Sequence, residues 1–144
     1  MKHRHLLAYM ESAKIFAGLS HATKLKVGAI AVKDDRIISI GINGTPSGWS
    51  NNCEMTIIDD HGNEYLTTVP EVSHAERNCL DKLARSTESG QGAIMFCTHS
   101  PCIECAKSIH NVGFSAVYYD TEYKKLDGIE FLEKCGIKVE KLVP

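Results

Sequence analysis

The chain has 144 residues, of which 43% are hydrophobic and 24% are charged, and its formal net charge is −2. This length suits a single domain, residues 1–144, that buries roughly two-thirds of its unfolded surface. No run of about 18 apolar residues exists, which excludes a membrane-spanning helix. Glu11 interrupts the N-terminal stretch before a signal-peptide core could form. The slightly acidic balance argues against a nucleic-acid groove, so we expect a cytoplasmic protein with neither membrane nor nucleic acid as partner.

Six cysteines and seven histidines are the unusual feature of this composition. Without a secretion signal the default compartment is reducing, so metal binding or catalysis explains the cysteines better than disulfides do. Cys79, Cys97 and Cys135 occupy apolar positions, and we expect them in the core, where a free cysteine behaves as a small hydrophobic residue. Cys102 and Cys105 instead form a C-x-x-C motif, which points to chemistry.

The hydrophobic pattern predicts an opening helix over residues 5–18 and then an antiparallel hairpin of strands over 27–32 and 36–41. The polar stretch from Asn43 to about Ser73 shows no periodicity. So long a loop is usually functional, mobile, or made of short elements that the pattern does not reveal. The remaining predicted elements are a helix from His74, a strand over 93–98, a helix over 101–112, a strand over 115–120, a helix over 127–135 and a strand over 137–142.

This order of elements predicts the fold class. Helices separate the last three strands, so these strands should run parallel through right-handed crossovers. The opening hairpin makes the sheet mixed. We therefore expect an α/β fold: a three-layer α/β/α sandwich around a five-stranded mixed sheet.

Two short fragments carry the candidate chemistry, His74-Ala75-Glu76 and Pro101-Cys102-Ile103-Glu104-Cys105. Each precedes a predicted helix, and both helices should begin at the carboxyl edge of neighbouring strands, where open α/β sheets bind ligands. Cys102 and Cys105 are three residues apart on one helix and so face the same side. The partial positive charge of the helix N-terminus favours their thiolate forms.

One histidine and two cysteines are three protein ligands, which leaves the fourth position of a tetrahedral zinc site for water. Such a zinc ion makes its water acidic near neutral pH. The carboxylate of Glu76, two residues after His74, is placed to take the proton. We therefore predict one catalytic zinc ion held by His74, Cys102 and Cys105, with Glu76 as the catalytic residue.

The pairing H-x-E and P-C-x-x-C is a known signature of zinc-dependent nucleobase deaminases. On this signature the sequence resembles the cytidine and deoxycytidylate deaminase superfamily, whose fold is the mixed-sheet sandwich. Three further segments, 27–30, 41–48 and 117–124, resemble those of deoxycytidylate (dCMP) deaminases. The resemblance runs from about Thr23 to Leu142, and the compact length is similar to that of phage or bacterial members.

The resemblance implies hydrolytic deamination of dCMP to dUMP and ammonia, a step that feeds dTMP synthesis. It implies that Asn43 contacts the sugar hydroxyl and that backbone groups of Ala75 and Ser100 hold the edge of the base. The carboxylate of Glu76 would shuttle protons to ring N3 and to the departing amino group.

The 5′-phosphate of such a substrate needs cations or N–H donors. Lys24 aligns with a basic residue used in some relatives, and Lys26, Tyr123 and Lys124 are further candidates. Relatives are usually homo-oligomers, often hexamers, and many are activated by dCTP and inhibited by dTTP. The resemblance therefore implies a homo-oligomer with these nucleotides as effectors.

Two alternatives remain at this point. Within the enzyme class, a zinc deaminase could act on tRNA adenosine, guanine, cytosine or a riboflavin-pathway pyrimidine. The net charge of −2 argues against a tRNA substrate. Outside that class, a non-catalytic zinc-binding interaction module would close its site with a fourth ligand, Cys53 or Cys97, and would not depend on Glu76.

Overall fold

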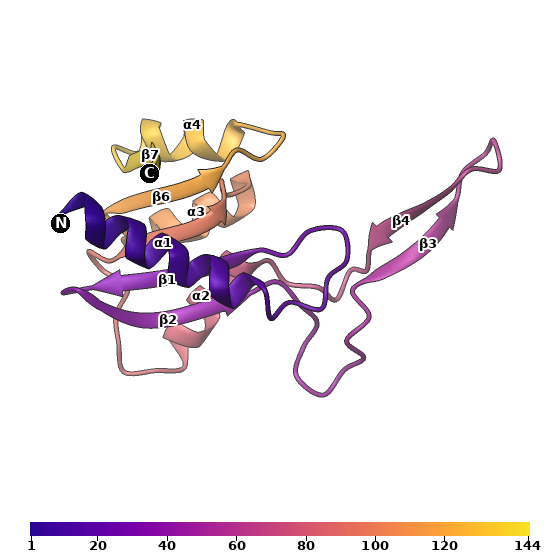
Figure 1. Ribbon diagram of the computed structural model, residues 1–144, viewed down its shortest axis with the longest axis horizontal. Helices are drawn as coiled ribbons and strands as arrows, with labels where there is room; N and C mark the ends of the chain where they lie inside the picture. Colours follow the sequence, from indigo (N-terminus) through magenta and orange to yellow (C-terminus); the bar gives the residue numbers. More distant parts are fainter.

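The computed structural model covers residues 1–144 and contains four helices and seven strands. Figure 1 shows their arrangement. In chain order they are α1 (His3–Ala17), β1 (Gly28–Lys33), β2 (Arg36–Ile42), β3 (Glu54–Ile58), β4 (Glu64–Thr68), α2 (Ala75–Ala84), β5 (Ile94–His99), α3 (Ile103–Val112), β6 (Ala116–Thr121), α4 (Asp127–Lys134) and β7 (Lys138–Lys141).

Five strands form one mixed sheet in the order β2-β1-β5-β6-β7. Strand β1 runs antiparallel to both β2 and β5, whereas β5, β6 and β7 are parallel. The β1–β2 turn places Asp34 and Asp35 at positive φ angles of 52° and 57°, the geometry of a type I′ turn that matches strand twist. The predicted five-stranded mixed sheet is confirmed.

Helices cover both faces of this sheet, so the predicted three-layer sandwich is also confirmed (Figure 1). Helix α1 alone packs on one face, through buried Leu6, Met10 and Ala13 against Phe96. Helices α2, α3 and α4 pack on the other face and build the larger core. No helix has the length and apolar character that crossing a bilayer requires.

The region from Asn43 to Ser73 contains an element that the pattern did not reveal. Strands β3 and β4 pair antiparallel into a two-stranded ribbon that projects from the sandwich (Figure 1). Asp59 closes its turn by accepting the backbone N–H groups of His61 and Asn63. Neither face of the ribbon lies on the core. Its sequence therefore lacks the alternation that marks a half-buried strand.

Two smaller expectations need correction. Cys79 and Cys97 are fully buried as expected, but Cys135 is only half-buried, because it lies just after the end of α4. Strands β2 and β5, whose carboxyl ends precede the two candidate fragments, are not neighbours. Strand β1 lies between them and runs in the opposite direction.

Candidate active site

Three metal-ligating side chains converge where helices α2 and α3 begin. His74 is the N-cap residue of α2, Cys102 is the N-cap residue of α3, and Cys105 lies in the first turn of α3. The Nδ1 atom of His74 is 3.5 Å from the sulfur of Cys102 and 3.4 Å from that of Cys105, and all three ligand atoms lie within 4.8 Å of one another. Sulfur and nitrogen ligands around tetrahedral zinc are separated by about 3.5 Å. These three residues therefore fit a zinc ion.

Close packing at two glycines sets the positions of these helix starts. A Cβ at Gly41, in β2, would collide with the backbone of Ala75 and Cys79. A Cβ at Gly128, in α4, would collide with the carbonyl groups of Pro101 and Cys102. The absence of a side chain at each glycine lets α2 lie close to the sheet and α4 lie close to the segment that carries Cys102.

The charges within the triad favour metal binding. Hydrogen bonds from Cys105 and His74 lower the pKa of the Cys102 thiol to about 3, which favours its thiolate form. The hydrogen bond with Cys102, together with burial, raises the pKa of the partner thiol Cys105. The hydrogen bond with Cys102 in turn raises the pKa of His74. These effects arise because the three side chains face one another at the starts of two helices.

Glu76 is the second residue of α2, and only 4% of its surface is exposed. Burial raises the pKa of its carboxyl group to about 7. A carboxyl group with a pKa near neutrality can both accept and donate a proton, which is the property of a general acid–base catalyst.

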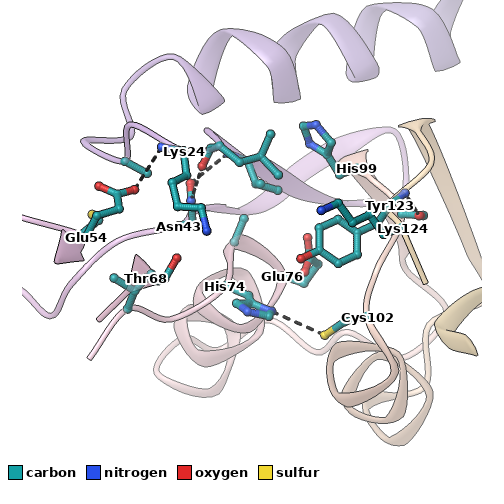
Figure 2. Close-up of a pocket in the computed structure, with 17 residues that line it drawn as sticks. Lys24, Asn43, Glu54, Thr68, His74, Glu76, His99, Cys102, Tyr123 and Lys124 are labelled. Atoms are coloured by element: carbon teal, nitrogen blue, oxygen red, sulfur yellow. Dashed lines mark hydrogen bonds between the residues drawn. The ribbon is translucent and has the colours of Figure 1, made fainter. Parts of the chain in front are cut away.

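A cavity of about 430 Å³ opens in front of these residues (Figure 2). Eight of the nine site residues expected from the sequence line it, and Cys105 is buried behind Cys102. Lys124 also lines this cavity, whereas Lys26 borders a separate, smaller hollow. The eight lining residues are Lys24, Asn43, His74, Ala75, Glu76, Ser100, Cys102 and Tyr123.

Asn43 and Ser100 hold loops of the cavity wall through side-chain hydrogen bonds. The Oδ1 atom of Asn43 accepts the N–H of Val27 at 2.9 Å, and its Nδ2 atom donates to the carbonyl of Leu25 at 2.7 Å. The hydroxyl of Ser100 accepts the N–H of Tyr123 at 2.7 Å. These bonds fix the loops that carry Lys24 and Tyr123 beside the cavity.

Sequence reasoning missed the part of the wall that comes from the base of the ribbon. Glu54 and Thr68 are the first pair of strands β3 and β4, and both line the cavity. The Oε2 atom of Glu54 accepts the backbone N–H groups of Thr23 and Lys24 at 3.0 and 3.1 Å. Burial acts to raise the pKa of this carboxyl group, but the two N–H donors outweigh it and hold the pKa below its usual value. No sequence pattern connects Glu54 with these residues, which lie 31 and 30 positions earlier in the chain.

A mixed-sheet sandwich with a His-Cys-Cys metal site, and a buried carboxylate beside it, defines a metal-dependent deaminase-type protein. The family model described as "Cytidine and deoxycytidylate deaminase zinc-binding region" matches residues 3–121. The chain therefore belongs to the cytidine and deoxycytidylate deaminase family.

The similarity of this chain to individual proteins supports the same family membership. The dCMP deaminase of cyanophage S-TIM5, solved in complex with dCMP and dUMP, is 46% identical, with a TM-score of 0.89 and 98% of both chains covered. The deoxycytidylate deaminase of enterobacteria phage T4 is 32% identical over 92% of this chain and 84% of its own length. That of Schizosaccharomyces pombe is 32% identical over 94% of this chain, which spans only 43% of the yeast enzyme.

Proposed function

We propose that this protein hydrolyses dCMP to dUMP and ammonia with one zinc ion per chain. The observation that carries the proposal is the likeness to the cyanophage enzyme, which was solved with dCMP and dUMP and matches nearly the whole of this chain. The cavity in front of His74 and Glu76 supports it independently, because a buried carboxylate and a three-ligand metal site face the same space.

His74, Cys102 and Cys105 would hold the zinc ion, which supplies Lewis-acid activation of a water molecule at neutral pH. The water oxygen bonds to C4 of cytosine, and the C4–N4 bond breaks to release ammonia. Glu76 takes one proton from the water and passes it to ring N3, and it then takes the remaining proton from the oxygen on C4 and delivers it to the departing amino group. The atoms of water and dCMP are thus all accounted for in dUMP and ammonia.

Backbone groups beside the metal ligands are suited to the base. Ala75 is the first residue of α2, so its N–H has no partner within the helix and can donate to a carbonyl oxygen of the ring. The N–H of Ser100 already donates to the carbonyl of Thr121 at 2.9 Å. We therefore propose that the carbonyl oxygen of Ser100, and not its N–H, accepts a hydrogen bond from the exocyclic amino group of cytosine. Asn43 keeps one donor and one acceptor site for the sugar hydroxyl.

Charged and polar side chains beside the cavity are suited to the 5′-phosphate. Figure 2 shows Lys24 on one side of the cavity and Tyr123 and Lys124 on the other. Two ammonium groups and a phenol supply donors and positive charge for a dianionic phosphate. We propose that Lys24, Tyr123 and Lys124 bind the 5′-phosphate. Lys26 is not a phosphate ligand in this proposal, because it borders the other hollow.

The partners and compartment follow from the same proposal. We propose that the chain assembles as a homo-oligomer, with a hexamer as the expected state, and that dCTP and dTTP act as effectors. All six cysteines are free, which supports a reducing compartment, and we propose the cytoplasm. Sedimentation, together with rate against dCMP concentration with and without dCTP or dTTP, tests the assembly and the regulation.

A substrate panel tests the activity. Ammonia release is measured from dCMP, CMP, deoxycytidine and adenosine-containing tRNA with the zinc-loaded protein. We expect dCMP to give the highest kcat/KM, and robust turnover of another substrate beside none of dCMP would overturn the proposal.

The phosphate assignment has its own matched pair of variants. Lys24→Ala should raise KM for dCMP roughly tenfold, as for the loss of one charged contact, and should leave KM for deoxycytidine unchanged. Lys26→Ala, only two residues away, is the control and should leave both values unchanged.

A further inference from the structure

The ribbon, residues 54–68, has no covering layer. Its two strands form a sheet of their own, separate from the five-stranded sheet. At about 3.3 Å per residue each five-residue strand is roughly 16 Å long, and Figure 1 shows the ribbon extending away from the sandwich. An isolated two-stranded hairpin is only marginally stable in water, and stable ones pack against a further strand or a helix.

Both faces of the ribbon expose large apolar side chains. Opposed residues of an antiparallel pair share a face, so Met55 and Tyr65 lie on one face and Ile58 and Leu66 on the other. These four side chains are between 46% and 64% exposed. Exposed apolar side chains gathered on one element mark a surface that contacts another molecule.

The charge of the ribbon indicates which molecule this is. The ribbon contains no Lys or Arg. Three of its four acidic residues, Asp59, Asp60 and Glu64, lie toward its turn, whereas Glu54 is buried at its base. Outside residues 54–68 the chain holds all 16 Lys and Arg against 14 acidic residues. The chain therefore carries an acidic apolar arm and, on the remainder, the basic excess that complements it.

We propose that the ribbon docks on the body of a second copy of this chain. Exchange across a two-fold axis lets each copy supply one ribbon and receive one, which doubles the buried area. The outer side of α1 and the residues after it offer apolar contacts in Ile15 and Leu19, which are 71% and 62% exposed. An anionic membrane is excluded as the partner because it would repel the acidic ribbon.

This inference assigns a surface to the homo-oligomer of the proposed function, on which it rests. The test of this inference measures molecular mass, whereas the substrate panel measures the release of ammonia. An inactive oligomer would overturn the proposed deamination of dCMP. An active monomer would overturn the proposed docking of the ribbon.

Sedimentation equilibrium of the zinc-loaded protein is the first test, with Ile58→Lys on one face of the ribbon and Tyr65→Lys on the other. We expect the wild-type chain to associate and at least one variant to lower the association constant tenfold or more. Ile37→Lys is the matched control, because it lies at the start of β2, outside the ribbon, and is also partly exposed. This variant should change the association constant less than twofold. A wild-type monomer at about 100 µM, where even weak interfaces associate, would overturn the proposal. So would unchanged association in both ribbon variants, or an equal loss in the control.

Photo-cross-linking is the second test, and it needs no variant to weaken assembly. A photoreactive amino acid replaces His61, which is exposed in the turn of the ribbon, in chains mixed from ¹⁴N and ¹⁵N cultures. We expect cross-linked peptides of mixed isotope composition that join the ribbon to the body. Cross-links confined to single-isotope pairs would show that the ribbon contacts its own chain, and would contradict the proposal.

Discussion

The cavity has two walls that are built differently. We call residues 74–76, 100, 102 and 105 the metal wall, and Lys24, Asn43, Glu54 and Thr68 the outer wall. The metal wall sits at the starts of two helices that pack on the core. The outer wall consists of loop segments and the base of the ribbon, and side-chain-to-backbone hydrogen bonds hold it together.

This difference separates two tasks. Reacting groups need rigid elements that fix their geometry within fractions of an ångström, whereas groups that only recognise a substrate tolerate a looser support. We therefore expect changes in the metal wall to act on metal binding and kcat. Changes in the outer wall should act on KM.

Removal of the metal should have the largest effect. Chelation should abolish ammonia release and lower the melting temperature, because a ligand bound only to the folded state stabilises it. Cys105→Ala should likewise lose stoichiometric zinc, measured by elemental analysis of the purified protein. Cys135→Ala, half-buried and outside the triad, is the control and should bind one zinc ion per chain. Full activity after complete chelation would contradict the metal wall's role.

Glu76→Gln should reduce kcat by roughly 10²- to 10⁴-fold, the usual contribution of a general acid–base group. The variant should keep stoichiometric zinc, because the amide has nearly the shape of the carboxyl group and the three ligands remain. Glu104→Gln is the matched control, since Glu104 lies in α3 and exposes 77% of its side chain. A near wild-type kcat in Glu76→Gln would contradict the role of Glu76 in proton transfer.

The metal wall was also the part that the sequence predicted. Cys102 and Cys105 are three residues apart on one helix, so local geometry alone places both sulfurs on one side. His74 then joins them because both helices begin at the same edge of the predicted sheet. The order of helices and strands could also be predicted from the sequence, because half-buried elements show the periodicity of their core-facing side chains.

The outer wall and the ribbon could not be predicted in this way. Glu54 reaches the N–H groups of Thr23 and Lys24 across about 30 residues, and such a contact leaves no local pattern. Ile57 and Ile58 are adjacent, as are Tyr65 and Leu66, so apolar residues fall on both faces of the ribbon and the two-residue alternation is absent. A strand without a buried face looks like a loop in the sequence.

Gly128→Ala tests the support of the metal wall from behind. The added methyl group would collide with the carbonyl groups of Pro101 and Cys102. We expect roughly tenfold weaker zinc affinity, as for other changes behind a metal ligand, measured by competition with a chromogenic chelator. Gly44→Ala is the control, because no atom lies within 4 Å of the added methyl position. Equal affinities in both variants would show that α4 does not position Cys102.

Glu54→Gln should have the smallest effect, and it probes the outer wall. We expect a severalfold rise in KM for dCMP with kcat nearly unchanged, because Glu54 fixes the backbone of Lys24 and lies away from the metal ligands. Glu64→Gln, an exposed carboxyl at the far end of the ribbon, is the matched control. A fall in kcat with KM unchanged would contradict the division between the walls.

The same pair of variants predicts a pH dependence of stability. The folded state holds the pKa of Glu54 below its usual value, so its ionised form stabilises the folded state at neutral pH. This contribution is fully present above the unfolded pKa, about 4.3, and is lost as the pH falls through the folded pKa. Urea unfolding should therefore show a larger difference between wild type and Glu54→Gln at pH 7 than at pH 3.

The pair Glu54 and Thr68 belongs at once to the cavity wall and to the projecting ribbon. Under the proposed docking, occupancy of the cavity and contact between copies involve one structural element, so any shift of this pair on docking would couple the two thermodynamically. Linkage is reciprocal: the factor by which association changes the affinity for dCMP equals the factor by which dCMP changes the association constant. An enzyme of this design would sense its own concentration through its affinity for substrate, without a separate regulatory domain.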